Sequence, residues 1–146
     1  MRRTTDCRTS GLNIRILITR SPESGLLPDL CSIDDEDFFI RGVIEIQVHG
    51  QDQPFGFGVW VSQKKENFQT YVDNFDSDSI GPFFGWLLTD LSCYPEGTAL
   101  LKTMARFRGK GVRPLIEVEP TDHPLAVDQQ NGITLERAWQ LIHHYM

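Results

Sequence analysis

The sequence lacks the features that mark several large classes of protein. Its longest apolar runs, such as residues 83–88, are far shorter than the roughly 18 residues that a transmembrane helix requires. Its three cysteines, Cys7, Cys31 and Cys93, are odd in number and share no repeated spacing, which argues against a secreted disulfide framework. We therefore expect a reduced, cytoplasmic protein with no membrane partner.

Recognised catalytic and cofactor motifs are also missing. The sequence contains no P-loop, dinucleotide-binding glycine fingerprint, zinc-protease motif or nucleophile elbow. Gly56 and Gly58 lie inside an alternating strand pattern, whereas a phosphate-binding loop would open a helix. The sequence therefore predicts no cofactor, no metal and no identifiable catalytic residue.

Basic residues are scarce outside the N-terminal segment. The formal net charge is −6, but the first 20 residues contain five arginines and one aspartate, which leaves −10 for residues 21–146. Such an acidic body repels phosphate backbones, so we expect no nucleic-acid partner. The charge favours solubility, and among partners it favours a basic protein or a cationic ligand.

The length of 146 residues, with 40% hydrophobic residues, suffices for one domain with a packed core. No aromatic residue precedes Phe38, and residues 21–28 contain two prolines and a glycine. We therefore predict a poorly ordered or degenerate N-terminal segment over residues 1–29, with at most an edge strand at 14–18. Residues 30–146 are predicted to form a single α+β domain.

Alternating apolar residues predict strands over residues 38–48 and 55–61. The turn between them, at 50–54, is too short for a crossover helix, so the pair should be an antiparallel hairpin. Gly42 interrupts the first strand and is a candidate for a bulge. Further strands are expected over 83–88, 98–107 and 112–119, where Glu117 and Glu119 share a face as acid/base carboxylates or, more simply, as solvated groups.

Apolar residues at helical spacing predict a helix capped by Ser62 and ending near Asp76, a second from Pro124 to Gly132, and a third from Leu135. In the third, Ala138, Trp139 and Ile142 form the apolar stripe. The element order predicts an α+β fold with an antiparallel sheet of about five strands and two or three packed helices. Four aromatic residues are expected in the core: Trp60, Phe83, Phe84 and Trp86.

The stretch 119–126 is the most informative for function. Asp122 and His123 fall where a strand ends and a helix begins, beside N–H groups that favour an anion. With Arg113 and Gln129 nearby, Asp122 and His123 form a candidate binding site. The structural alternative is that Asp122 or Thr121 caps the helix and His123 bonds locally.

Three functions are consistent with these residues. The leading hypothesis is a small cytosolic binding or interaction module that takes a polar small molecule or a basic protein. The alternative is a hydrolase-like enzyme in which His123 is the general base, supported by Asp122 or Glu119. No serine or cysteine nucleophile is marked by the sequence. A third hypothesis is an immunity-type protein that neutralises a basic toxin.

Six segments together resemble a bacterial family of domains of unknown function, over about residues 30–142. The segments are 34–42, 58–62, 85–87, 113–114, 122–126 and 132–134. The resemblance implies no activity, because the family has none to transfer. It includes the C-terminal T-D-H-P-L-A motif, which residues 121–126 of this chain carry.

The same family is expected to begin with a C-x-x-C-G segment followed by a histidine, which looks like a metal-binding knuckle. This chain keeps Cys7 and Gly11, but Ser10 stands at the second cysteine and Ile14 at the histidine. Because a structural zinc site needs four nitrogen or sulfur ligands, one thiolate cannot hold zinc alone. We therefore predict that the purified protein contains no stoichiometric zinc.

Overall fold

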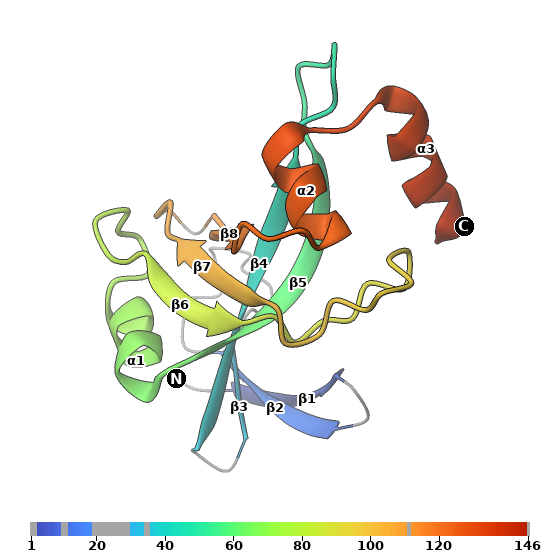
Figure 1. The fold of residues 1–146 in the computed structure, drawn as a ribbon. Coiled ribbons are helices and arrows are strands. Elements are labelled where there is room, and N and C mark those ends of the chain that lie inside the picture. Colours follow the sequence, from blue (N-terminus) through green and yellow to red (C-terminus); the bar gives the residue numbers. More distant parts are fainter. Residues whose placement is uncertain (1–2, 10–11, 19–29, 34–35, 111, 146) are drawn as a thin grey trace.

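The computed structural model of the protein describes residues 3–9, 12–18, 30–33, 36–110 and 112–145. Within these residues, eight strands and three helices follow one another along the chain, which confirms the α+β class (Figure 1). The strands are β1 (Arg3–Thr9), β2 (Leu12–Ile18), β3 (Leu30–Ile33), β4 (Asp37–Ile46), β5 (Phe55–Gln63), β6 (Phe83–Trp86), β7 (Lys102–Arg106) and β8 (Leu115–Val118). The helices are α1 (Lys65–Asp73), α2 (Pro124–Asn131) and α3 (Leu135–His144).

Strands β4 to β8 are joined in a circuit, which we call the five-strand ring. β4 and β5 form the predicted antiparallel hairpin, and β6, β7 and β8 follow as antiparallel neighbours. β5 meets β6 through the bridge between Val61 and Leu87, and the Leu88 N–H donates to the Trp60 carbonyl at 2.8 Å.

The ring closes where β8 pairs with β4, with Val43 opposite Leu115. This pairing is parallel, so the expectation of a purely antiparallel sheet is wrong at this junction. The reason is geometric: five successive strands that alternate in direction bring the last one back in the direction of the first.

Strands β1, β2 and β3 extend the same sheet beyond one edge of β4. The strand expected at 14–18 lies within β2, which pairs with β1 on one side and β3 on the other. It is therefore not an edge strand. The division of the chain at residue 29 into an N-terminal segment and a domain stays a prediction.

Aliphatic side chains fill the inside of the ring, and the period-two pattern in β4 places its apolar residues there. The fully buried ones include Ile40, Ile44, Ile46, Val59, Val61, Leu87, Ala105 and Ile116. Gly42 pairs in regular register with Val59, so the predicted bulge is absent. A Cβ atom at Gly42 would lie 2.5 Å from Cγ1 of Ile116, and the glycine therefore makes room for β8.

Helix α1 covers one side of the ring, and α2 and α3 lie on the other (Figure 1). The Phe68 ring of α1 lies 4.9 Å from Phe38, and Tyr71 lies 4.7 Å from Phe107. Ser62 does not cap α1 as predicted. It belongs to β5, where its Oγ accepts the Trp86 N–H at 2.9 Å and helps to hold β6 against β5.

Helices α2 and α3 bury their small and aliphatic residues, Leu125, Ala126, Ala138 and Leu141. Trp139, which was expected on the buried stripe of α3, is 52% exposed. Among the described residues, no helix has the length and apolar character to cross a bilayer.

We expect Gly85→Ala to lower the free energy of unfolding by about 1–3 kcal/mol, the usual cost of overpacking. A Cβ atom at Gly85 would collide with the Ser62 carbonyl oxygen and lie 2.9 Å from Nε2 of Gln63, at the junction of β5 and β6. Urea denaturation of the purified variant measures the loss.

Gly56→Ala is the matched control, because its added Cβ would approach no atom closer than Cγ1 of Val43 at 3.2 Å. We expect this variant to change stability by less than about 1 kcal/mol. Equal stability of the two variants would show that the β5–β6 junction does not require a glycine.

Candidate functional site

A groove of about 620 Å³ lies over the outer face of the five-strand ring and beside α2. The outer face is the surface opposite the buried side chains of β4 to β8. Residues of β4, β6, β7, β8 and α2 line the groove, together with Pro54 of the hairpin turn and Pro120 after β8.

Strand register arranges the outer side chains in rows. Phe84 of β6 lies opposite Met104 of β7, and Met104 lies opposite Glu117 of β8. In the next row Trp86 lies opposite Lys102, whose carbonyl accepts the Glu119 N–H at 2.8 Å. The outer face is thus aromatic along β6 and acidic along β8.

Phe84 and Trp86 of β6 do not join the core as predicted, whereas Phe83 packs against it. Phe84 is 40% exposed and Trp86 is 42% exposed, and their rings meet edge to face at 5.1 Å. Trp60 and Phe83 are half-buried. With Met104, which is 37% exposed, Phe84 and Trp86 form a contiguous apolar surface that we call the apolar patch.

Three carboxylates line the groove, and they differ in their ion pairs. Glu117 pairs with Nε of Arg106 at 2.6 Å, and Glu45 lies 3.8 Å from Nη1 of Arg108. Glu119 has no ion pair with any residue that the structure describes. Lys102, which neighbours Glu119 on the next strand, has its Nζ 6.0 Å from the centre of the Trp86 ring.

Gln129 of α2 lies at the edge of the groove and takes the place of a missing strand. Its Oε1 accepts the Val118 N–H at 2.7 Å, and its Nε2 donates to the Ile116 carbonyl at 2.9 Å. β4 and β8 diverge after Leu115, so these backbone groups have no strand partner on that side. The carboxamide of Gln129 therefore supplies the donor and acceptor that a peptide group would supply.

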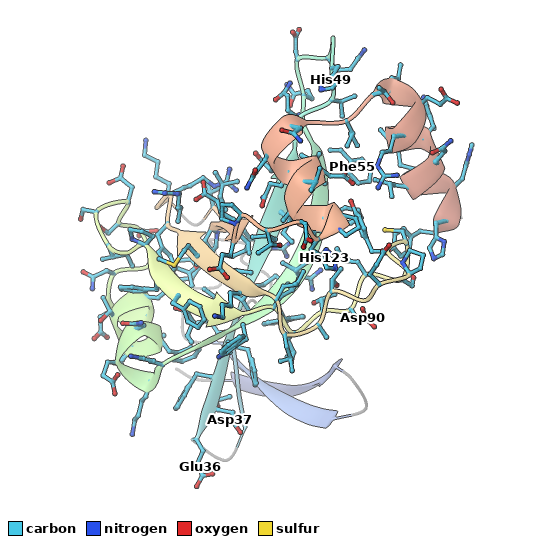
Figure 2. The ribbon with its side chains drawn as sticks, viewed as in Figure 1. Glu36, Asp37, His49, Phe55, Asp90 and His123 are labelled. Atoms are coloured by element: carbon cyan, nitrogen blue, oxygen red, sulfur yellow. The ribbon has the colours of Figure 1, made fainter. Side chains whose placement is uncertain are left out.

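His123 is the N-cap of α2, a role that the sequence suggested for Asp122 or Thr121. Its Nδ1 accepts the Leu125 N–H at 3.1 Å, so Nε2 carries the proton and donates to the Gly97 carbonyl at 2.7 Å. Figure 2 shows His123 at the N-terminal end of α2, next to the loop that carries Asp90. Both ring nitrogens are thus bonded to backbone groups.

The structure does not gather the four predicted site residues in one place. Gln129 lines the groove, but Arg113, Asp122 and His123 do not. Arg113 precedes β8 and Asp122 follows it, so they flank opposite ends of the strand. Asp122 is exposed, and Arg113 is half-buried with its carbonyl bonded to the Arg108 side chain at 2.6 and 2.9 Å.

A polar network ties the loop between β6 and β7 to both C-terminal helices. The Tyr94 hydroxyl donates to Oδ2 of Asp128 at 2.7 Å, and Arg137 pairs with the same carboxylate at 2.8 Å. Burial and the hydrogen bond to Asp128 raise the pKa of Tyr94, so its hydroxyl stays protonated. The hydrogen bond to Asp128 also raises the pKa of Arg137.

These placements bear on the hydrolase hypothesis. His123 has no ring nitrogen left to act as a base, because both are hydrogen-bonded. In the described part of the chain, a serine hydroxyl contacts a histidine ring only at Ser92 and His144, 3.0 Å apart. Both residues are exposed and lie outside the groove, and no described carboxylate orients His144.

No group of three or more His, Cys, Asp or Glu residues that could hold a metal ion occurs within the described residues. The side chain of Cys7 and the residues Ser10 and Gly11 lie outside them. The absence of bound zinc therefore stays a prediction.

Comparison with known proteins identifies a family. The model of the family described as "Uncharacterized protein conserved in bacteria (DUF2199)" matches residues 13–133. The chain therefore belongs to this family, as its resemblance suggested, although the match begins and ends earlier than the expected range of 30–142. No curated protein and no solved structure matches the chain at a significant level.

We expect His123→Ala to lower the free energy of unfolding by about 1–3 kcal/mol, because it removes a helix cap and the bond to Gly97. His123→Asn should recover part of this loss, since asparagine is a good N-cap. Asp122→Ala should change stability by less than about 0.5 kcal/mol. Urea denaturation of the three variants checks the order, and an Asp122→Ala loss equal to that of His123→Ala would contradict it.

Gln129→Ala should also destabilise the protein by about 1–3 kcal/mol, because it leaves the Val118 N–H and the Ile116 carbonyl without partners. Gln130→Ala, at the next and exposed position of α2, is the control and should have little effect. Hydrogen exchange provides a local measurement: the Val118 amide should exchange faster in Gln129→Ala alone. Unchanged protection of Val118 would mean that Gln129 does not replace a strand.

Proposed function

We propose that this member of a bacterial family is a small interaction module whose groove receives a segment of a partner protein. The observation that carries the proposal is the apolar patch. Phe84 and Met104 lie side by side on the groove floor, 40% and 37% exposed. Contiguous exposed apolar surface on a folded protein commonly marks an interaction site.

The residue types of the patch favour protein recognition. Aromatic residues and methionine are enriched in the cores of protein interfaces, and tryptophan is common among the residues that dominate binding energy. Trp86 continues the patch beside Phe84, and the two rings are in contact. A partner would therefore meet two aromatic rings and a methionine side chain next to one another.

The patch is also held rigidly. Its residues lie on β6 and β7. β6 pairs along its full length with residues 102–105 of β7, and β7 pairs in turn with β8. The Thr103 hydroxyl donates to the Gly85 carbonyl at 2.9 Å beneath the patch. A preformed surface loses little conformational entropy on binding, which supports affinity.

The groups that line the groove favour binding over hydrolysis. The lining residues include no serine, cysteine or histidine. The hydroxyl of Thr103 lies on the buried side, bonded to Gly85. The groove therefore offers carboxylates, amides and a lysine for recognition, without a nucleophile and a base in contact.

Peptides selected from a random library on the wild-type protein test the proposal. We expect Phe84→Ser and Met104→Gln to weaken the binding of selected peptides by about tenfold or more, as loss of a central interface residue does. Isothermal titration calorimetry measures the affinities. Both variants should remain folded, because each changes an exposed position.

Leu135→Gln is the matched control, because it replaces an exposed apolar residue on α3, 47% exposed, outside the groove. It should leave binding unchanged. Selected peptides that bind Phe84→Ser, Met104→Gln and wild type equally would contradict the proposal, as would a library that yields no binder.

A further inference from the structure

The proposed groove also has a chemical preference, and this inference rests on the proposed function. We infer that the partner segment carries a lysine or arginine whose charged end pairs with Glu119 while its aliphatic stem lies over the apolar patch. Glu119 directly follows β8, and the patch lies on β6 and β7 of the same outer face. Glu119, Phe84 and Met104 line one groove.

The state of the three groove carboxylates singles out Glu119. Arg106 already neutralises Glu117, and Arg108 lies near Glu45. Glu119 is exposed and makes no ion pair in the described part of the chain. A cation from a partner can therefore pair with Glu119 without competing with an arginine of this protein.

Lys102 is the cation nearest to Glu119 along the strand register, but it is directed elsewhere. Its Nζ lies 6.0 Å from the centre of the Trp86 ring, over the strand on the other side of β7. Attraction between an ammonium group and the face of a tryptophan ring accounts for this placement. Because Lys102 contacts Trp86, the carboxylate of Glu119 remains available to a cation from a partner.

Lysine and arginine match this arrangement because each combines an apolar stem with a charged end. Met104 and Phe84 offer apolar surface to the stem, and Glu119 at the rim offers a charge to the end. A volume of about 620 Å³ accommodates a few side chains, within the usual range of ligand sites. The occupant that fits is a short extended segment with an apolar residue beside the basic one.

Charge on a larger scale points the same way. The charged residues that line the groove are three glutamates and one lysine. Residues 21–146 carry a net charge of −10, and such a field attracts a basic partner and raises its association rate. Binding should therefore weaken as salt rises.

The experiment uses a peptide selected on the wild-type protein and a second copy of it with its lysine or arginine replaced by norleucine. Glu119→Gln should weaken binding of the basic peptide about two- to fivefold, the range expected for an exposed ion pair. It should leave binding of the norleucine peptide unchanged. Glu96→Gln, which removes an exposed carboxylate outside the groove, should affect neither peptide.

The outcomes separate this inference from the proposed function. Selected peptides that depend on Phe84 and Met104 but contain no basic residue, or that bind Glu119→Gln as tightly as wild type, would overturn the inference and leave the interaction module intact. Loss of all groove-dependent binding overturns both. Sedimentation of the protein alone identifies the other possible occupant: a dimer that Glu119→Gln dissociates would mean that a second copy of the chain fills the groove.

Discussion

The fold depends on which segments form hydrogen bonds with the backbone groups along one edge of β4. That edge meets β3 first, then β8 at Val43 and Leu115, and finally the segment before α3, where Ile133 exchanges hydrogen bonds with Gln47 and His49 at 2.8 Å. In the interval where β4 and β8 diverge, Gln129 supplies the bonds that β8 lacks. A single helix thus closes the gap in the ring and forms a wall of the groove.

Much of the fold could be predicted from the sequence, because period-two and helical spacing are local signals. The β4–β5 hairpin and the positions of α2 and α3 follow from such patterns and from short turns. The parallel closure of β8 on β4 does not, since it depends on the number of strands that separate them. The predicted cap of α1 was wrong for a similar reason. The alternating pattern of β5 continues through Ser62, whose hydroxyl accepts a hydrogen bond from Trp86 of β6.

The candidate site was harder to predict than the fold. Residues 83–88 are apolar on both faces of a strand, so their pattern cannot tell which face is covered. The neighbouring strands indicate which face is exposed. On β7, Lys102, Met104 and Arg106 alternate with buried residues, and at β8 Glu117 and Glu119 do the same. Gln129 was predicted as a binding residue, and its hydrogen bonds to β8 were not predicted, because a side chain that substitutes for a strand leaves no local pattern.

The contacts of Gln129 and Ile133 also set an order of events during synthesis. The edges of β4 and β8 are satisfied by residues that follow both strands in the chain. When β8 has just emerged from the ribosome, all five strands of the ring have been synthesised. The backbone groups along β8 and after β4 that bond to Gln129 and Ile133 are then still unpaired. Such exposed edges are the features through which unfinished chains associate. Between the emergence of Glu119 and that of Ile133, these backbone groups of β8 and of residues 47–49 therefore lack the hydrogen bonds that they have in the folded protein.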